Sequence, residues 1–245
     1  MAANGGIHVG TSGWHYKHWR GPFYPGDTPA AAMFAFYFRR FQAVELNTSF
    51  YHLPSPQALR GWRSAAPPGF VFAMKGSRFI THMKKLKDPT PALAVFIERA
   101  VLLGPHLGPI LFQLPPRWAL NLERLREFLE AFPPRLRCAF EFRDPSWFVE
   151  PVFRLLERYR AALCIYHIAG RLAPVRVTTD LVYLRLHGPD GAYAGSYDDA
   201  TLARWAEEMA RWAAEGRTVH CYFDNDQAGY AAQDALRLKA MVGGA

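Results

Sequence analysis

Six apolar stretches of this chain have the composition of buried β-strands, and each ends in charged or amide residues. The first two run from Gln42 to Asn47 and from Phe70 to Lys75, and the others cover residues 109–113, 138–143, 182–187 and 219–226. A charge at the end of a buried strand costs several kcal/mol unless it is paired or used. Parallel strands that close into a barrel bring such ends to one mouth, where barrel proteins bind their ligands. The pattern therefore predicts a ligand site built from strand ends.

Eight segments have strand character, and helical periodicity separates most of them. Strands are predicted at Ile7–Gly10, Ala43–Asn47, Phe70–Lys75, Pro109–Gln113, Arg137–Arg143, Ala162–Tyr166, Leu181–His187 and Thr218–Phe223. Alternating strands and helices favour parallel βαβ units. Eight such units in 245 residues favour an α/β fold with a single (β/α)8 TIM-like barrel domain over residues 1–245.

One stretch departs from this alternation. Residues 168–180 contain Gly170, Pro174 and several β-branched residues, without a convincing amphipathic helix. We therefore expect the helix after the sixth strand to be missing or reduced.

Composition limits the environment of the chain. No apolar run approaches the about 20 residues that a membrane-spanning helix needs, and residues 1–6 have neither a basic region nor an apolar signal core. We expect a soluble cytoplasmic protein. Cys138, Cys164 and Cys221 lie in apolar strand segments and form no C-x-x-C pair, so we expect buried, reduced thiols.

The charge of the chain indicates its partners. A formal net charge of +8 favours anionic partners such as nucleic acid or phosphorylated ligands. One tight cluster, Lys84-Lys85-Leu86-Lys87, is interpreted as a solvated loop.

The predicted strand ends supply a set of polar side chains that share one face, because alternate residues of a strand point to the same side. The set consists of Glu45, Asn47, Lys75, Gln113, Glu141, Arg143, Arg185, His187 and, after the last strand, Asn225 or Asp226. It holds three permanent cations against two strand carboxylates. This balance opposes a polynuclear metal centre and suits an oxyanion, above all a phosphate.

Loops after the strands add aromatic and polar candidates. They are Ser12, Trp14, Tyr51, His82 and Trp147. Aromatic rings beside cations suit the stacking of nucleobases or sugars. Packing onto the barrel is the alternative for about half of the loop aromatics, and a solvated or loop-bracing role is the alternative for His82. For the strand-end charges the alternative is a buried ion network without chemistry, which is costly to bury.

Short motifs follow one another along nearly the whole chain. They include Gly10-Thr11-Ser12-Gly13-Trp14, Val44-Glu45-Leu46-Asn47, Phe72-Ala73-Met74-Lys75, GPILFQLPP at 108–116, Glu141-Phe142-Arg143, Arg185-Leu186-His187-Gly188 and residues 222–226. In this order they resemble the YecE-like family, also called domain of unknown function 72. The resemblance implies a TIM-like barrel and coincides with the strand-end set, but it implies no function. Asp224 and Asp234 stand where the family pattern would have Asn.

The leading hypothesis is a pocket that binds a phosphate-bearing ligand, with DNA or RNA as the best candidate. Lys75, Arg143 and Arg185 would hold the phosphate, and Glu45 or Glu141 would orient them or act as a general base. If the protein is an enzyme, phosphodiester hydrolysis fits these groups.

The remaining roles complete this hypothesis. His187 would be the acid–base partner, while Trp14, Tyr51 and Trp147 would stack. The alternatives are a metal-dependent sugar or sugar-phosphate isomerase or lyase that uses one divalent ion, and a non-catalytic nucleic-acid-binding or adaptor protein. In the isomerase or lyase alternative, Glu45 and Glu141 would act with the divalent ion. The sequence requires no cofactor, and the leading hypothesis assigns no metal ligands.

Overall fold

The computed structural model describes residues 6–243 and divides into two compact units. Unit 1 consists of residues 1–45, 165–175 and 180–245, and unit 2 consists of residues 46–164 and 176–179. The expectation of one domain over residues 1–245 stays a prediction.

The order of the elements is that of a TIM-like barrel. Eight parallel strands lie at the predicted segments: β1 (Ile7–Thr11), β2 (Ala43–Leu46), β3 (Val71–Lys75), β4 (Leu107–Gln113), β5 (Cys138–Glu141), β6 (Ala162–Ile168), β8 (Leu181–Leu186) and β9 (Thr218–Phe223). The α-helices are α1 (Ala30–Phe38), α2 (Thr48–Tyr51), α3 (Pro56–Ala65), α4 (Pro89–Ala100), α5 (Leu122–Ala131), α6 (Glu150–Arg158), α7 (Asp199–Ala214) and α8 (Tyr230–Gly243). The alternation confirms the predicted α/β fold class.

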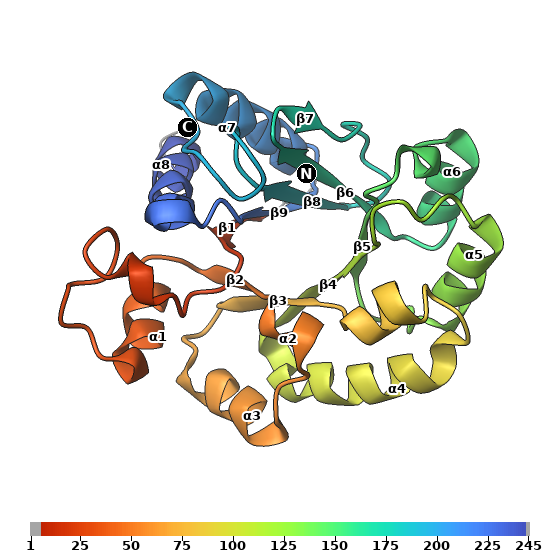
Figure 1. The fold of residues 1–245 in the computed structure, drawn as a ribbon, viewed down its shortest axis with the longest axis horizontal. Coiled ribbons are helices and arrows are strands. Elements are labelled where there is room, and N and C mark those ends of the chain that lie inside the picture. Colours follow the sequence, from red (N-terminus) through yellow and green to blue (C-terminus); the bar gives the residue numbers. More distant parts are fainter. Residues whose placement is uncertain (1–5, 244–245) are drawn as a thin grey trace. The chain divides into compact units, whose positions relative to one another are not determined.

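In unit 2 the strands β3, β4 and β5 are neighbours, with β4 in the middle, and α3, α4 and α5 lie on their outer side (Figure 1). The Phe112 ring of β4 lies 4.8 Å from that of Phe128 on α5, and Phe140 of β5 joins this apolar layer. Because alternate residues point to opposite sides, Leu111 and Gln113 lie on the face turned away from the helices.

In unit 1 the strands follow the order β1-β9-β8-β6, and α7 and α8 cover β9 and β1 (Figure 1). A parallel bridge between Ser12 and Glu45 joins the end of β1 to β2. Gly10 makes this close approach possible, because a Cβ atom there would lie 2.1 Å from the carbonyl oxygen of Ala43. The Tyr37 hydroxyl accepts a hydrogen bond from the Thr11 amide and donates one to the Ala43 carbonyl, which fixes both strands.

As predicted, the described residues between β6 and β8 form no helix. The chain forms an antiparallel hairpin there, in which β7 (Arg171–Leu172) pairs with the end of β6, and residues 173–180 have no regular structure. In unit 1 a pocket of about 690 Å³ lies between β7 and α7 and is lined by Leu172, Tyr197 and Trp205 among others. None of its lining residues belongs to the predicted site.

Composition led to expectations about the cysteines and about membrane-spanning helices. Cys138, Cys164 and Cys221 are buried thiols, as predicted, and burial raises the pKa of the Cys138 thiol to about 12. Between residues 6 and 243, no helix has the length and apolar character needed to cross a membrane.

Candidate functional site

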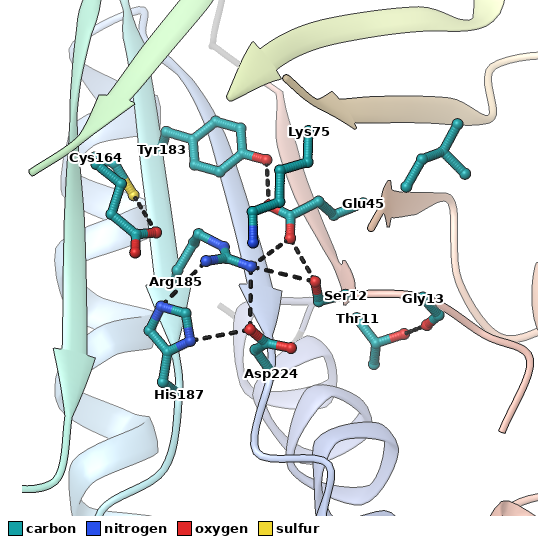
Figure 2. Close-up of polar contacts among 12 residues, drawn as sticks. Thr11, Ser12, Gly13, Glu45, Lys75, Cys164, Tyr183, Arg185, His187 and Asp224 are labelled. Atoms are coloured by element: carbon teal, nitrogen blue, oxygen red, sulfur yellow. Dashed lines mark hydrogen bonds and ion pairs between the residues drawn. The ribbon is translucent and has the colours of Figure 1, made fainter. Parts of the chain in front are cut away.

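Arg185, at the end of β8, is the centre of a buried ion network in unit 1 (Figure 2). Its Nη2 donates to Glu45 Oε1 at 2.6 Å and to Asp224 Oδ2 at 3.1 Å. Ser12 Oγ donates to the same Glu45 oxygen, and the Tyr183 hydroxyl donates to the other one at 2.7 Å. Burial, followed by the nearby Glu45 charge, raises the pKa of Tyr183, so this hydroxyl keeps its proton. Two carboxylates therefore oppose one permanent cation.

His187 links Arg185 to Asp224 and is itself fully buried. Arg185 Nη1 lies 3.2 Å from His187 Nε2, and His187 Nδ1 lies 3.0 Å from Asp224 Oδ2. A guanidinium can only donate, so Nε2 is the acceptor and Nδ1 carries the proton that it shares with Asp224. His187 is thus a neutral imidazole enclosed between a cation and a carboxylate.

The strand register of unit 1 explains why these side chains meet. Arg185 pairs with Tyr222 of β9, so Asp224, two residues further, lies on the same face as Arg185 and His187. The Asp224 amide also donates to the Leu186 carbonyl, which continues the ladder beyond the strands. This geometry supports the buried-network alternative for Arg185 and Glu45. The acid–base role of His187 stays a prediction.

A second set of strand ends lies in unit 2. Lys75 of β3 pairs with Leu111 of β4, and Gln113 pairs with Glu141 of β5. Paired residues of neighbouring strands point to the same side, as do alternate residues along one strand. Lys75, Gln113 and Glu141 therefore share the face turned away from the helices, which we call the strand-end face of unit 2.

Arg143 joins this face through Glu141. Its Nε donates to Glu141 Oε1, and the Cys164 thiol donates to Glu141 Oε2 at 3.8 Å. The Glu141 side chain is fully buried, whereas 12 % of the Arg143 side chain is exposed. The carboxylate thus fixes the guanidinium at the rim of the face.

Lys75 is the second cation of this face, and it contacts an aromatic cluster. Its side chain is largely buried, and Nζ lies 4.5 Å from the centroid of the Phe50 ring, a cation–π contact. The His82 ring meets the edge of the same phenyl ring at 5.0 Å, and its Nδ1 lies 2.9 Å from Thr81 Oγ1. Burial lowers the pKa of His82 to about 4, and the Arg78 and Lys75 charges contribute. His82 is neutral at pH 7, beside an excess of positive charge.

The predicted stacking residues have different environments. Trp147 is fully buried, lies flat against Phe142 at 4.8 Å and donates from Nε1 to the Trp118 carbonyl at 2.7 Å. This position fits the packing alternative. Trp14 is half-buried, with its ring 5.0 Å from that of Phe34 in unit 1. Tyr51 is 71 % exposed, whereas Asn47 is half-buried at the start of α2.

The two residues that follow Asp224 have partners outside the Arg185 network. Asn225 Nδ2 donates to Asp234 Oδ2 of α8 at 2.7 Å and to the Gly195 carbonyl at 2.8 Å. The Asp234 carboxylate also accepts from Ser196 Oγ and the Tyr197 amide. Because all these partners donate, a carboxylate fits the position better than the Asn of the family pattern, whose NH₂ group would face donors.

Asp226 contacts a tryptophan and a histidine of unit 1. Its Oδ1 accepts from Trp19 Nε1 at 2.6 Å and lies 3.2 Å from His18 Nε2. Burial raises the pKa of this carboxyl. His18 carries no signal in the sequence, because no strand or motif marks it.

Sequence reasoning also missed Asp224 and Tyr183 of unit 1 and Phe50 of unit 2 as members of these clusters. Tyr183, Arg185 and His187 are alternate residues and share one face of the strand, which would have placed Tyr183 in the cluster. The pairing of β8 with β9 would have added Asp224 to it. Phe50 gives no such signal, because its contact with Lys75 depends on the turn that follows β2. No group of three or more His, Cys, Asp or Glu side chains within residues 6–243 is arranged to hold a metal ion.

Comparisons with known proteins cover almost the whole chain. Residues 8–245 match the family described as "Protein of unknown function DUF72". The chain is 31 % identical to the UPF0759 protein YecE of Escherichia coli K12, over 46 % of this chain and 42 % of that protein, which is less than half of its length. It is 24 % identical to the UPF0759 protein YunF of Bacillus subtilis, over 96 % and 94 % of the two chains.

A crystal structure is similar over the same extent. A DUF72 family protein of Thermotoga maritima has a TM-score of 0.89 and 26 % identity, with coverage of 97 % of this chain and 99 % of that chain. A second DUF72 family protein, from Enterococcus faecalis, has a TM-score of 0.84 at 20 % identity and shares the fold.

Proposed function

The chain belongs to the DUF72 family, and from the geometry of its strand ends we propose that it binds a phosphate-bearing ligand, with DNA or RNA as the best candidate. The observation that carries the proposal is the occurrence of a lysine and an arginine together on the strand-end face of unit 2. Lys75 and Arg143 lie there with Glu141 as the strand carboxylate. By contrast, two carboxylates surround Arg185 in unit 1.

The chemistry of this face suits phosphate. Glu141 holds the Arg143 guanidinium at Nε, and this group carries five N–H donors in a fork that matches phosphate oxygens. The Lys75 ammonium adds a compact charge. The lowered pKa of His82 supports a positive potential, since the Arg78 and Lys75 charges contribute to it. An anion would relieve the repulsion among these cations.

Gln113 lies on the middle strand, between the two cations. Its buried Oε1 has no hydrogen-bond partner among residues 6–243, and a buried acceptor left without a donor costs about 1–3 kcal/mol. A sugar hydroxyl or a base amine of a nucleotide would satisfy this oxygen. The combination of two cations and an amide favours a nucleotide over a bare phosphate.

Hydrolysis is a further step that this face supports less well. Attack of water on a phosphodiester needs a base for the proton of water and an acid for the departing alkoxide. Glu141 could accept the first proton. His82 is neutral at pH 7 because of its low pKa, so it is a poor acid for the second step. The proposal is therefore one of binding, with hydrolysis tested separately.

The proposal is tested by fluorescence anisotropy with labelled single-stranded, duplex and abasic-site DNA at near-physiological salt. The test variant is Lys75→Ala/Arg143→Ala. The matched control is Arg60→Ala/Arg154→Ala, which removes the same charge from exposed positions on α3 and α6 of the same unit. Thermal melting of both variants checks that they remain folded.

We expect the test variant to lose at least tenfold in affinity and the control to stay within about twofold, since direct phosphate contacts outweigh general surface charge. Equal losses of affinity in both variants would contradict the proposal, and general attraction to the basic surface would then explain the binding. If wild type binds none of the three DNA probes, nucleic acid is wrong, and competition with phosphorylated sugars decides whether the phosphate assignment survives.

A further inference from the structure

Half of the net positive charge of the chain lies in one short segment of unit 2. Residues 75–88 contain five basic side chains, Lys75, Arg78, Lys84, Lys85 and Lys87, against one acidic residue, Asp88, and so carry +4 of the formal +8. The segment begins on the strand-end face and continues into the loop before α4. Phosphate contacts in this loop would therefore extend those at Lys75.

The same segment exposes large apolar side chains. Phe79 is 48 % exposed and Met83 is 66 % exposed, and Tyr51 at the end of α2 is 71 % exposed. The Tyr51 ring touches Phe50 at 5.0 Å, and Phe50 touches both His82 and Lys75. The exposed Tyr51 ring thus connects through Phe50 to the cation of the strand-end face. Exposed apolar groups beside cations mark an interaction surface.

The loop is held in place by buried anchors. Ile80 and Thr81 are buried within the π-helical turn at residues 79–83, and Leu86 is buried between two lysines. Lys85, Leu86 and Asp88 adopt left-handed backbone conformations, with φ of 47°, 62° and 44°. The cluster at residues 84–87 is therefore an anchored loop, and ordering it on binding would cost little entropy.

An apolar groove of about 320 Å³ opens beside Phe79. Its lining combines the turn with the start of α4 and includes Leu53, Phe79, Ile80, Pro91, Val95 and Phe96. The groove is large enough for one flat heteroaromatic ring, and its charged neighbours lie on the same segment.

We infer that this surface binds single-stranded nucleic acid. The inference rests on the proposed phosphate-binding function and specifies its ligand. Tyr51 stacks on one base, the groove beside Phe79 takes another, and the lysines of residues 84–87 contact the intervening phosphates. Stacking needs bases whose faces are open, so a duplex would lose these contacts and keep only the phosphate contacts.

The experiment measures anisotropy with a labelled oligothymidylate of about 12 nucleotides and with the same strand in a duplex. The stacking variant is Tyr51→Ala/Phe79→Ala, with Tyr51→Phe/Phe79→Tyr as the variant that restores the rings. Leu172→Ala/Val175→Ala removes two exposed apolar side chains from unit 1 and serves as control. Lys84→Ala/Lys85→Ala/Lys87→Ala tests the phosphate contacts.

We expect the stacking variant to lose at least tenfold in affinity for the single strand and little for the duplex, since each stacked base contributes strongly. The ring-restoring variant should bind like wild type. The lysine variant should lower the slope of log affinity against log salt by about 2, from three phosphate contacts on a single strand.

Unchanged preference for the single strand in the stacking variant would overturn the inference, even if Lys75→Ala/Arg143→Ala still abolishes binding and the proposed function stands. If Lys75→Ala/Arg143→Ala binds like wild type, the proposed function is wrong, whatever the stacking variant shows. A third outcome would also overturn the inference and assign the surface to membranes. In that outcome the wild type binds phosphatidylserine vesicles, the stacking variant does not, and neither protein prefers single-stranded DNA.

Discussion

The two units of this protein place similar side chains at strand ends and surround them differently. In unit 1, Glu45 and Asp224 neutralise Arg185, and His187 is enclosed as a neutral link. In unit 2, Lys75 and Arg143 share a face with Glu141, and the charges of Lys75 and Arg78 both act on His82. The strand-end cation of unit 1 thus forms buried ion pairs, whereas those of unit 2 belong to a positively charged face.

The charges that surround a strand-end cation, more than its position in the strand, determine whether it can bind an anion. A buried cation between two carboxylates gives a phosphate no net attraction, because the anion would meet two like charges. Cations in excess of carboxylates attract an anion and are themselves relieved by it. The following predictions test this contrast.

The largest effect is expected from Arg185→Met. This change leaves the buried carboxylates of Glu45 and Asp224 without their cation, so the free energy of unfolding should fall by about 3–5 kcal/mol. Lys75→Met, on the face with excess cations, should cost less than half as much. Urea denaturation of both variants measures the contrast, and equal losses would contradict it.

Asp224→Asn should have a smaller effect. The amide oxygen can still accept from His187 Nδ1 or from Arg185, and Glu45 still neutralises the guanidinium. We expect the free energy of unfolding to change by less than about 1 kcal/mol, against about 2–3 kcal/mol lost in Asp224→Leu, which removes the acceptor. If Asn destabilises as much as Leu, the charge of Asp224 is essential and the network is balanced differently.

The pH dependence of stability should reveal His82. Its pKa is about 4 in the folded protein, below the ordinary 6.5, so the unfolded chain takes up the proton first as the pH falls. The stabilising contribution is complete above pH 6.5 and is lost between pH 6.5 and 4. After solvent screening it amounts to about 1 kcal/mol. His82→Gln should remove this loss, whereas His52→Gln, at an exposed position in the same unit, should keep it.

The same histidine reports on the ligand. An anion near Lys75 and Arg78 offsets the charges that lower the pKa of His82, so binding should raise this pKa. Titration of the imidazole by NMR, with and without an oligonucleotide, measures the change. A pKa that stays at about 4 in the complex would place the anion elsewhere.

The smallest effect is expected from Asp88→Asn. Asp88 forms an exposed pair with Lys84 at 3.3 Å and has a left-handed conformation that Asn also tolerates. The change raises the charge of residues 75–88 and should increase affinity for single-stranded DNA about two- to threefold, without a change in melting temperature. Weaker binding would show that the pair positions Lys84.

Most of the fold could be predicted from the sequence because its signals are local. The eight strands are apolar runs bounded by charges, and helices lie between most of them, as the periodicity predicts. Residues 168–180 lack amphipathic periodicity, and they form a hairpin and a loop. The family was identified from motifs spread along the chain, and the match over residues 8–245 confirms it.

The site could be predicted only in part, because pairing across strands depends on register. Parity along one strand placed Glu141 with Arg143 and Arg185 with His187, and both pairs are in contact. It could not show that Asp224 would neutralise Arg185, since this depends on how β9 is aligned with β8. It also could not distinguish the buried Trp147 from the exposed Tyr51, because both are loop aromatics in sequence.

The central claim is that an anion binds to the strand-end face of unit 2 and not to the Arg185 network of unit 1. The most direct test is an NMR titration of the deuterated protein with a short oligothymidylate, followed through backbone amide shifts. The account predicts the largest shifts at Gly76, His82 and Arg143. Shifts concentrated at Arg185, His187 and Asp224, with unit 2 unchanged, would contradict it.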